Sequence, residues 1–345
     1  MLNCGIFALS EMIKKEASLS TEIGGYFGLD LPYYCDPFPN AYKFQSGRAA
    51  LRAVLEWSGI KQVWLPEYIC DSVFQAIEDS GAAAKTYRLD DSLYPKGLTP
   101  LSLNAGVILY VNYFGLCQDN VNRLLKKIPN KHLVIDNSQA LFEKHSDALA
   151  TIYSARKFVG VPDGGFLMVS GLEIEEPLIE DRDSIDRMKH LLLRMAYSAS
   201  EGYEDFIKSE NSLGNTTPLS MSWLTKRLLA GIDMQQVIRR RRENFLQLAA
   251  LLDKYNIRKW FLNSETVPLC YPLMVDYKVD NIRYNLRNEN IFIPTYWPNL
   301  KIQAADNGIE YKMIHNCLAI PCDQRYSTIQ MAEIANKIIY RLHNK

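Results

Sequence analysis

Short apolar runs alternate with helical patterns through the first two-thirds of the chain, and this alternation restricts the fold more than any other feature. Short apolar runs that are separated by helices are typical of a mostly parallel sheet. Strands are predicted at Gln62–Leu65, Ala84–Leu89, Gly106–Asn112, His132–Asp136, Ala148–Tyr153 and Gly165–Val169. Helices are predicted at Gly47–Ser58, Ser72–Ser80, Asn120–Lys127 and Asp181–Ser198.

The last third of the chain has a different pattern. The polar stretch Glu201–Ser220 predicts a loop, and a long helix is expected over Met234–Lys254. Further strands are predicted at Val267–Asp276, Ile291–Pro294 and Cys317–Ile320, before a terminal helix at Thr328–Arg341. We therefore expect an N-terminal segment and a large α/β domain over residues 1–240, and a small C-terminal α+β domain over residues 241–345.

Composition narrows the classes of partner. Lys plus Arg and Asp plus Glu both number 39 among 345 residues, so no net charge favours a nucleic acid or an anionic membrane. The seven cysteines have no metal-ligand spacing, and their odd number favours reduced thiols. We expect a cytoplasmic protein with no metal site, no signal peptide and no membrane span.

Lys157 lies between two apolar runs, with Ser154 three residues before it and the turn Pro162–Gly165 after it. We expect this lysine to be buried between strands. Burial lowers the pKa of an amine and makes it nucleophilic, which is the setting of a lysine that forms a Schiff base. The alternative is a surface lysine, which the neighbouring Arg156 favours.

Asp136 follows a predicted strand, at the end where ligands bind in open α/β sheets. It is followed by Asn137, Ser138 and Gln139, and Gln139 could donate a hydrogen bond to a phenolate oxygen. Pyridoxal phosphate (PLP) requires both a lysine and an acid, for its aldehyde and its pyridinium nitrogen. The alternative for Asp136 is an ordinary turn or capping aspartate.

A third group of polar residues opens the helix predicted at Gly47. Ser46 is a suitable N-cap, Gly47 allows close approach, and the free amides of a helix start bind phosphate. A cation in the first turn is disfavoured by the helix dipole, so an anion would explain Arg48. A plain capped helix, with Arg48 directed to solvent or to a nearby acid, remains the alternative. The basic run Arg239–Arg242 is interpreted as a solvated or interface helix face.

In this order the motifs resemble the DegT/DnrJ/EryC1/StrS family of fold-type-I PLP-dependent enzymes, the sugar aminotransferases, from about Gly24 to the C-terminus. Ser46–Leu51 is similar to the phosphate turn of that family. Asp136–Ala140 is similar to its Asp-x-x-Gln-Ala motif, which implies Asp136 on the pyridine nitrogen and Gln139 near the 3′ oxygen. Lys157, with Ser154 before it and a glycine pair after it, is similar to the Schiff-base lysine.

The resemblance also implies an assembly. Gly214–Thr216 lies near the position of the family's Gly-Tyr-Asn, which implies that Asn215 reaches the cofactor phosphate in a partner subunit of a homodimer. The chain departs from the family at Arg48, which replaces a threonine. For the residue that stacks on the cofactor ring, Tyr68 is the only aromatic in the matching segment, whereas the alignment favours Cys70.

What the resemblance implies is a divergent PLP-dependent aminotransferase that acts on a keto-sugar, with a nucleotide-linked sugar as the default and an amino donor such as glutamate. Its products would serve cell-surface polysaccharide or secondary-metabolite sugar synthesis. Lys157 would act as general base. The alternatives are a PLP-dependent sugar dehydratase or decarboxylase, or a non-catalytic PLP-fold binding protein. A Rossmann oxidoreductase is disfavoured because the glycine fingerprint is missing.

Overall fold

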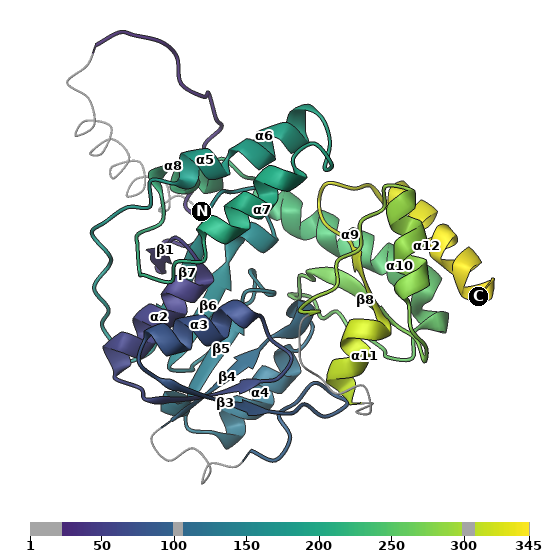
Figure 1. The fold of residues 1–345 in the computed structure, drawn as a ribbon, viewed down its shortest axis with the longest axis horizontal. Helices are drawn as coiled ribbons and strands as arrows, with labels where there is room; N and C mark the ends of the chain where they lie inside the picture. The colour runs from purple at the N-terminus through teal and green to yellow at the C-terminus, as the bar shows by residue number, and fades with distance from the viewer. Residues whose placement is uncertain (1–22, 99–105, 299–307, 345) are drawn as a thin grey trace.

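The computed structural model describes residues 23–98, 106–298 and 308–344. The chain forms a seven-stranded sheet and, in its C-terminal part, a two-stranded sheet. Figure 1 shows helices packed around the larger sheet. The mostly parallel central sheet that the alternation predicts is therefore confirmed.

The central sheet has the strand order β1-β7-β6-β5-β4-β2-β3. Strands β2 to β6 run parallel to one another, whereas β7 pairs antiparallel with both β6 and β1. Every residue of β4 is buried, as expected for a strand covered on both faces. The bounds are β1 Tyr42–Phe44, β2 Gln62–Pro66, β3 Ala83–Tyr87, β4 Val107–Val111, β5 Leu133–Asn137, β6 Ala150–Ser154 and β7 Gly165–Val169.

Helix α2 (Gly47–Ser58) shows why these segments become helical. The Ser46 side chain accepts a hydrogen bond from the backbone of Ala49, and Gly59 ends the helix with a φ of 67°. Its buried alanine, leucine and valine side chains form one face that packs on β6 and β7. Helix α3 (Asp71–Asp79) links β2 to β3, and helix α4 (Gln118–Lys127) links β4 to β5.

The C-terminal part is built around the antiparallel pair β8 (Cys270–Met274) and β9 (Cys317–Pro321). Helix α9 (Met234–Leu252) packs against α12 (Thr328–His343) and β8. Helices α10 (Asp280–Asn288) and α11 (Ile309–His315) complete this part. The buried Glu310 of α11 accepts a hydrogen bond of 2.7 Å from the backbone of Leu89, after β3, so α11 is tied to the central sheet.

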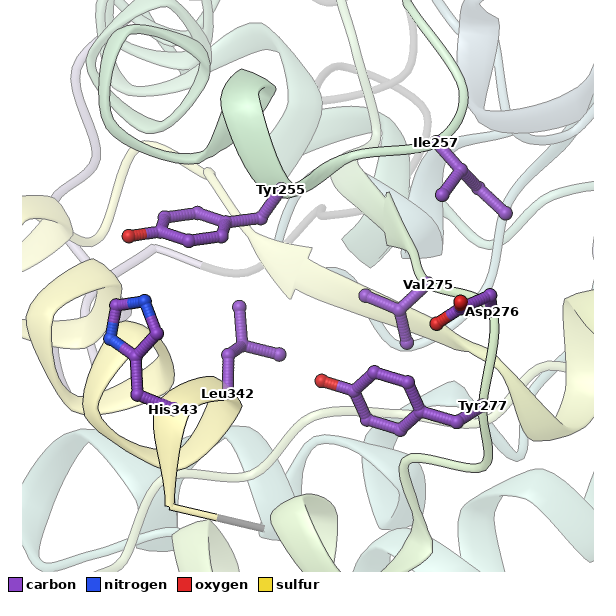
Figure 2. A pocket seen from close by; sticks show the side chains of 7 residues that line it. All are labelled: Tyr255, Ile257, Val275, Asp276, Tyr277, Leu342 and His343. Atoms are coloured by element: carbon purple, nitrogen blue, oxygen red, sulfur yellow. The ribbon is translucent and has the colours of Figure 1, made fainter.

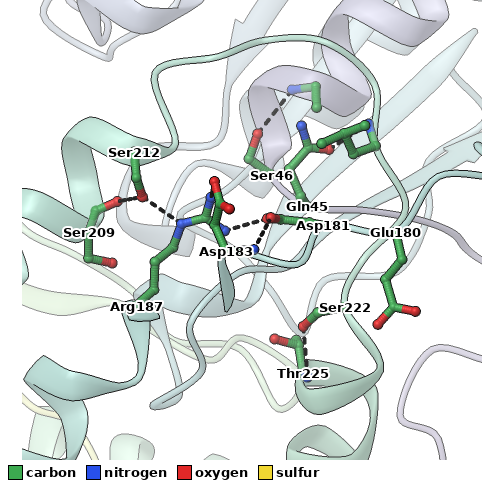
Figure 3. Close-up of polar contacts among 12 residues, drawn as sticks. Gln45, Ser46, Glu180, Asp181, Asp183, Arg187, Ser209, Ser212, Ser222 and Thr225 are labelled. Carbon is green, nitrogen blue, oxygen red and sulfur yellow. Dashed lines mark hydrogen bonds and ion pairs between the residues drawn. The ribbon is translucent and has the colours of Figure 1, made fainter. Parts of the chain in front are cut away.

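In the sequence, four helices separate β7 from α9: α5 (Ser184–Arg187), α6 (Lys189–Ala196), α7 (Tyr203–Ser212) and α8 (Trp223–Ala230). A buried ion pair between Asp181 and Arg187 anchors this group, and Arg187 also donates a hydrogen bond of 2.6 Å to the Ser212 hydroxyl (Figure 3). None of the helices in the described residues is long and apolar enough to cross a membrane.

Two element predictions are wrong. The loop predicted over Glu201–Ser220 contains α7, whose first turn carries Glu204 and Asp205, where the helix dipole favours acids. The strand predicted at Ile291–Pro294 does not form, and only Ile293 of that run is buried. Residue 240, the predicted domain boundary, falls inside α9, and the boundary stays a prediction.

Candidate active site

Three segments that carry predicted site residues meet at the carboxyl ends of the parallel strands. Asp136 of β5 is paired in register with Ile152 of β6. A Cβ atom on Gly47, at the start of α2, would lie 3.4 Å from the Ser138 hydroxyl and 3.6 Å from the Tyr153 carbonyl oxygen. The helix start, the end of β5 and the end of β6 are therefore neighbours.

The glycine pair after Lys157 makes this approach possible. A Cβ atom on Gly165 would lie only 2.2 Å from the carbonyl carbon of Ser46, so no side chain fits there. Gly164 has a φ of 124° and donates its backbone N–H to the Gln45 carbonyl at 2.8 Å. The start of β7 is thus pressed against the residues that begin α2.

The start of α2 offers free backbone donors. The first N–H groups of a helix have no partner inside it. Ser46 accepts from Ala49 through its side chain at 3.2 Å and from Ala50 through its carbonyl at 3.1 Å. The N–H groups of Gly47 and Arg48 have no acceptor in the described part of the chain. Such a pair of amides can bind an anion.

Gln139 presents a buried donor. Its side-chain oxygen accepts a hydrogen bond of 2.8 Å from the backbone of Phe114, which fixes the orientation of the amide. The amide nitrogen is buried and has no partner among the residues that the structure describes. Asp136 is half-buried, and its Oδ1 accepts a hydrogen bond of 2.8 Å from the backbone of Ser138.

The expectation that Lys157 is buried is wrong for the single chain. Lys157 ends a short 3-10 turn, Ala155–Lys157, that follows β6, and its side chain is exposed. The turn buries Ala155 and Phe158 on either side and directs the lysine outward. Within the described residues its amine has no hydrogen bond or ion pair. Ser154, half-buried, is paired in register with Gly165.

Arg48 lies beside a second arginine that the sequence did not single out as a site residue. Burial lowers the pKa of Arg48, and the nearby Arg156 lowers it further, while Cys70 and Glu210 oppose these effects. Arg156 is ion-paired with Glu210 of α7. Arg48 has no hydrogen bond or ion pair in the described part of the chain. The adjacent basic pair Arg156-Lys157 was the signal that could have pointed to Arg156.

The two candidates for the residue next to the cofactor ring lie in different surroundings. Tyr68 is buried in an aromatic cluster, with ring centroids 5.6 Å from Tyr113 and 4.7 Å from Trp297. Cys70 is half-buried at the start of α3, where it interacts electrostatically with Arg48. The ring contact of either residue stays a prediction.

Asn215 is not joined to the other predicted residues within one chain. It is exposed, and its side-chain oxygen accepts a hydrogen bond of 3.0 Å from the backbone of Thr217. The neighbouring Thr216 is held by Asp79 at the end of α3 and by Arg52 of α2.

Asp163, in the turn between Lys157 and the glycine pair, is a second residue that the sequence left unassigned. Its side chain is fully buried, and burial raises its pKa to about 6, although the hydroxyls of Ser222 and Thr225 lower it in part. An acid between a proline and two glycines, flanked by apolar runs, was the signal in the sequence.

The predicted residues do not line the cavities found elsewhere on the chain. One cavity, of about 250 Å³, lies between the end of α12 and the segment after β8, and Figure 2 shows Tyr255, Tyr277 and His343 around it. A second, of about 300 Å³, is lined by residues of α4, by Glu143–Ser146 and by Asn263 and Glu265. Neither contains Lys157 or Asp136.

Comparison with solved structures gives matches over most of the chain. An aminotransferase of the DegT/DnrJ/EryC1/StrS type from Brucella abortus is 14% identical, with a TM-score of 0.60 over 98% of this chain and 91% of that one. The chain has the PLP-dependent fold type I. The aminotransferase TlmJ from Streptoalloteichus hindustanus is 15% identical, with a TM-score of 0.60 over 88% and 86% of the two chains.

The Helicobacter pylori aminotransferase PseC, involved in pseudoaminic acid biosynthesis, is 16% identical, with a TM-score of 0.59 over 88% of this chain and 87% of that one. Neither the models of known protein families nor the curated proteins match the sequence. The likeness therefore lies in the fold, and the activity must be argued from the residues of the site.

Proposed function

We propose that this chain is a PLP-dependent aminotransferase that transfers an amino group to a keto-sugar. The observation that carries the proposal is the convergence, at one edge of a fold-type-I sheet, of the Asp136 strand end, the Lys157 turn and the free amides of α2. A carboxylate, an amine and a phosphate-binding helix start are the groups that the polar atoms of PLP require.

The described residues fit this cofactor. The buried amide nitrogen of Gln139 lacks an acceptor, which the phenolate oxygen of PLP would supply. The amides of Gly47 and Arg48, with the arginine side chain, would hold the phosphate, next to Ser46. Asp136 would lie on the pyridine nitrogen, and the amine of Lys157 would hold the aldehyde. Cys70 and Ser154 would lie beside the bound group.

When bound, PLP supplies a ring that accepts the electron pair released as a bond at the α-carbon of an amine breaks. The Asp136 carboxylate would keep the ring nitrogen protonated. The Nζ of Lys157 would act as the general base that takes the proton from the α-carbon of an amino donor such as glutamate, and it would later return a proton to the product. The position of this amine would therefore affect the rate.

The choice of a keto-sugar as substrate is supported by the likeness to solved structures, among which PseC is involved in the biosynthesis of pseudoaminic acid. We take a nucleotide-linked keto-sugar as the first substrate to test, in a pathway of cell-surface polysaccharide or secondary-metabolite sugar synthesis. A cytoplasmic location would suit a nucleotide-linked substrate.

The exposed lysine supports a second part of the proposal, a homodimer in which the partner subunit covers the site. Exclusion of water would strengthen the electrostatic interactions of Lys157 and limit side reactions, and the single chain leaves this side chain exposed. Asn215 is exposed and free of the other site residues, so it is available to the phosphate of the partner's site.

The decisive experiment is to incubate the purified protein with PLP, reduce it with borohydride and map the cofactor by peptide mass analysis. We expect the label on Lys157, its absence in Lys157→Ala, and no change in Lys61→Ala, which alters an exposed lysine before β2. A label on another lysine would refute the assignment.

Product analysis then separates the reactions that use the same residues. With a nucleotide-linked keto-sugar, formation of an amino sugar that depends on glutamate supports transamination. Loss of water or carbon dioxide without a donor would identify a dehydratase or a decarboxylase instead, and cofactor binding without turnover of any donor would identify a binding protein.

A further inference from the structure

The backbone carbonyl of Phe158, the residue directly after Lys157, accepts two side-chain hydrogen bonds. Arg241 of α9 donates through Nη2 at 3.0 Å, and Gln324, after β9, donates through Nε2 at 2.7 Å. The guanidinium carbon of Arg241 also lies 4.5 Å from the centre of the Phe158 ring. The lysine turn is thus attached on its C-terminal side to two residues from the last third of the chain.

Arg241 differs from the other members of the basic run Arg239–Arg242. Only 2% of its surface is exposed, whereas the side chain of Arg240 is 39% exposed and ion-paired with Glu243. The expectation that the whole run is a solvated or interface face is therefore wrong at Arg241. The register of α9 explains this, because Val237, Arg241, Phe245 and Leu248 share its buried face.

The buried guanidinium has carbonyl oxygens as its partners. Nη1 donates to Pro268 at 3.3 Å and to Leu269 at 3.1 Å, and within the described residues Arg241 has no ion pair. Burial lowers its pKa, although Cys322 and Asp323 lie near enough to oppose this. An apolar side chain would fill the same space without the desolvation penalty of a charge, so packing alone does not account for an arginine here.

A chain of hydrogen bonds continues from Arg241 to the other side of the candidate site. The backbone N–H of Leu269, whose carbonyl binds Arg241, donates to the Phe114 carbonyl at 2.9 Å. The N–H of Phe114 in turn donates to the Gln139 side chain at 2.8 Å. The carbonyl next to Lys157 and the amide of Gln139 are therefore both tied to one planar group.

We propose that Arg241 is a positioning residue that, together with Gln324, sets the place of Lys157 relative to Gln139. The inference rests on the proposed function, because it concerns the same site. The two Nη atoms have a fixed spacing, so they hold the carbonyls of Phe158 and Leu269 at a fixed separation. Lysine, with a single mobile amine, cannot bind both in that geometry.

The test uses Arg241→Lys, which keeps the charge, and Gln324→Met, which removes the second donor to Phe158 without burying a new charge. Arg240→Gln, on the exposed side of the same helix, is the matched control. The first readout needs no cofactor: amide hydrogen exchange in residues 155–161 of the full chain. We expect faster exchange there in both variants, with exchange in β4 and β5 unchanged.

The second readout is the rate at which PLP becomes attached to Lys157, trapped by borohydride, together with the pH midpoint of the absorbance of the attached cofactor. We expect roughly a tenfold to hundredfold slower attachment in Arg241→Lys, a smaller loss in Gln324→Met, and a shifted midpoint in both. Attachment at the wild-type rate with an unchanged midpoint in both variants would overturn the proposal.

The two proposals fail in different ways. If wild-type protein attaches no PLP at Lys157, the proposed function fails, and the exchange measurement still decides whether Arg241 and Gln324 hold the turn. If wild type attaches PLP at Lys157 and both variants attach it as wild type does, only the positioning role of Arg241 fails. Should Arg241→Lys not fold, Gln324→Met carries both readouts.

Discussion

Arg48 combines three properties that rarely occur together on a helix surface. It lies in the first turn, it is partly buried, and within the described residues it has no hydrogen bond or ion pair. The helix dipole and the neighbouring Arg156 both disfavour its charge. A phosphate bound at the amides of α2 would offset both effects, because it brings two negative charges to contact distance.

We therefore expect Arg48→Ala to weaken PLP affinity by about tenfold to a hundredfold, the range of one lost charge-assisted hydrogen bond. Arg48→Lys should restore part of the loss. Affinity is measured by titration of the cofactor absorbance, with Lys61→Ala, which removes an exposed cation before β2, as the control. Equal affinity in wild type and Arg48→Ala would leave the backbone amides alone as the phosphate site.

Asp163 gives a prediction on pH. Its folded-state pKa is raised from 3.8 to about 6, so between these values the folded protein binds more protons than the unfolded chain. Stability contributed by this group is complete below the unfolded pKa and is lost as the pH rises to about 6. The loss is on the order of 3 kcal/mol if the whole shift is realised.

Asp163→Asn should remove this pH-dependent contribution to the free energy of unfolding. Its melting temperature, compared with that of wild type across pH 4 to pH 7, should rise relative to wild type as the pH increases, since an amide has no proton to lose. A constant difference between the two proteins over this range would show that Asp163 does not titrate there.

At the scale of elements, the contact of β7 with the start of α2 decides whether the site forms. Gly165 does not have a positive φ, so a substitution there causes a steric clash and no backbone strain of its own. Gly165→Ala should shift the start of α2 and destabilise the protein by several kcal/mol, the range of severe overpacking. Gly160→Ala, where the added carbon meets only Leu191 at 3.7 Å, is the control and should change stability by less than about 0.5 kcal/mol.

Both variants are compared by urea unfolding and by PLP titration. If the added methyl group of Gly165→Ala leaves both stability and cofactor affinity at wild-type values, the close approach of β7 to Ser46 is not required for the site.

How far the sequence predicts the elements depends on how local their causes are. Helix α2 matches its prediction at both ends, because Ser46 caps it and Gly59 stops it within the same short segment. Strand β1, three residues long, was missed because only its pairing with β7 identifies it. Helix α7 was not predicted because its polar residues are typical of a loop, whereas its packing against α6 stabilises a helix.

The site shows the same limit. Lys157, Asp136 and Gln139 could be selected from local patterns, and the fold places their segments at one sheet edge. Exposure of Lys157 and burial of Arg241 could not be predicted, because each depends on residues far along the chain.

At the scale of the whole molecule, large apolar side chains are exposed on helices α5 to α7 and in the segment before α5. Ile185 and Met195 are 73% and 80% exposed, and Leu178, Ile179, Tyr197 and Tyr203 are exposed as well. Large apolar side chains that are exposed on neighbouring helices are typical of an interaction surface. A second copy of the chain is the occupant that the proposed two-chain site requires.

We expect the protein to sediment as a dimer at micromolar concentration and the double variant Ile185→Glu, Met195→Glu to shift it toward monomer with loss of activity. Ile329→Glu, on the exposed side of α12, is the control for an added charge and should remain dimeric. A wild-type monomer with full activity would exclude a site built from two chains.

The two hydrogen bonds to the Phe158 carbonyl have a consequence for the order in which the chain is made. Their donors lie 83 and 166 residues further along the sequence. On the ribosome the strands that flank the lysine emerge long before Gln324 exists, so the turn cannot reach its final position during synthesis of the central sheet. A truncation at the predicted boundary near residue 240 would likewise keep every residue proposed to contact PLP and lose both donors.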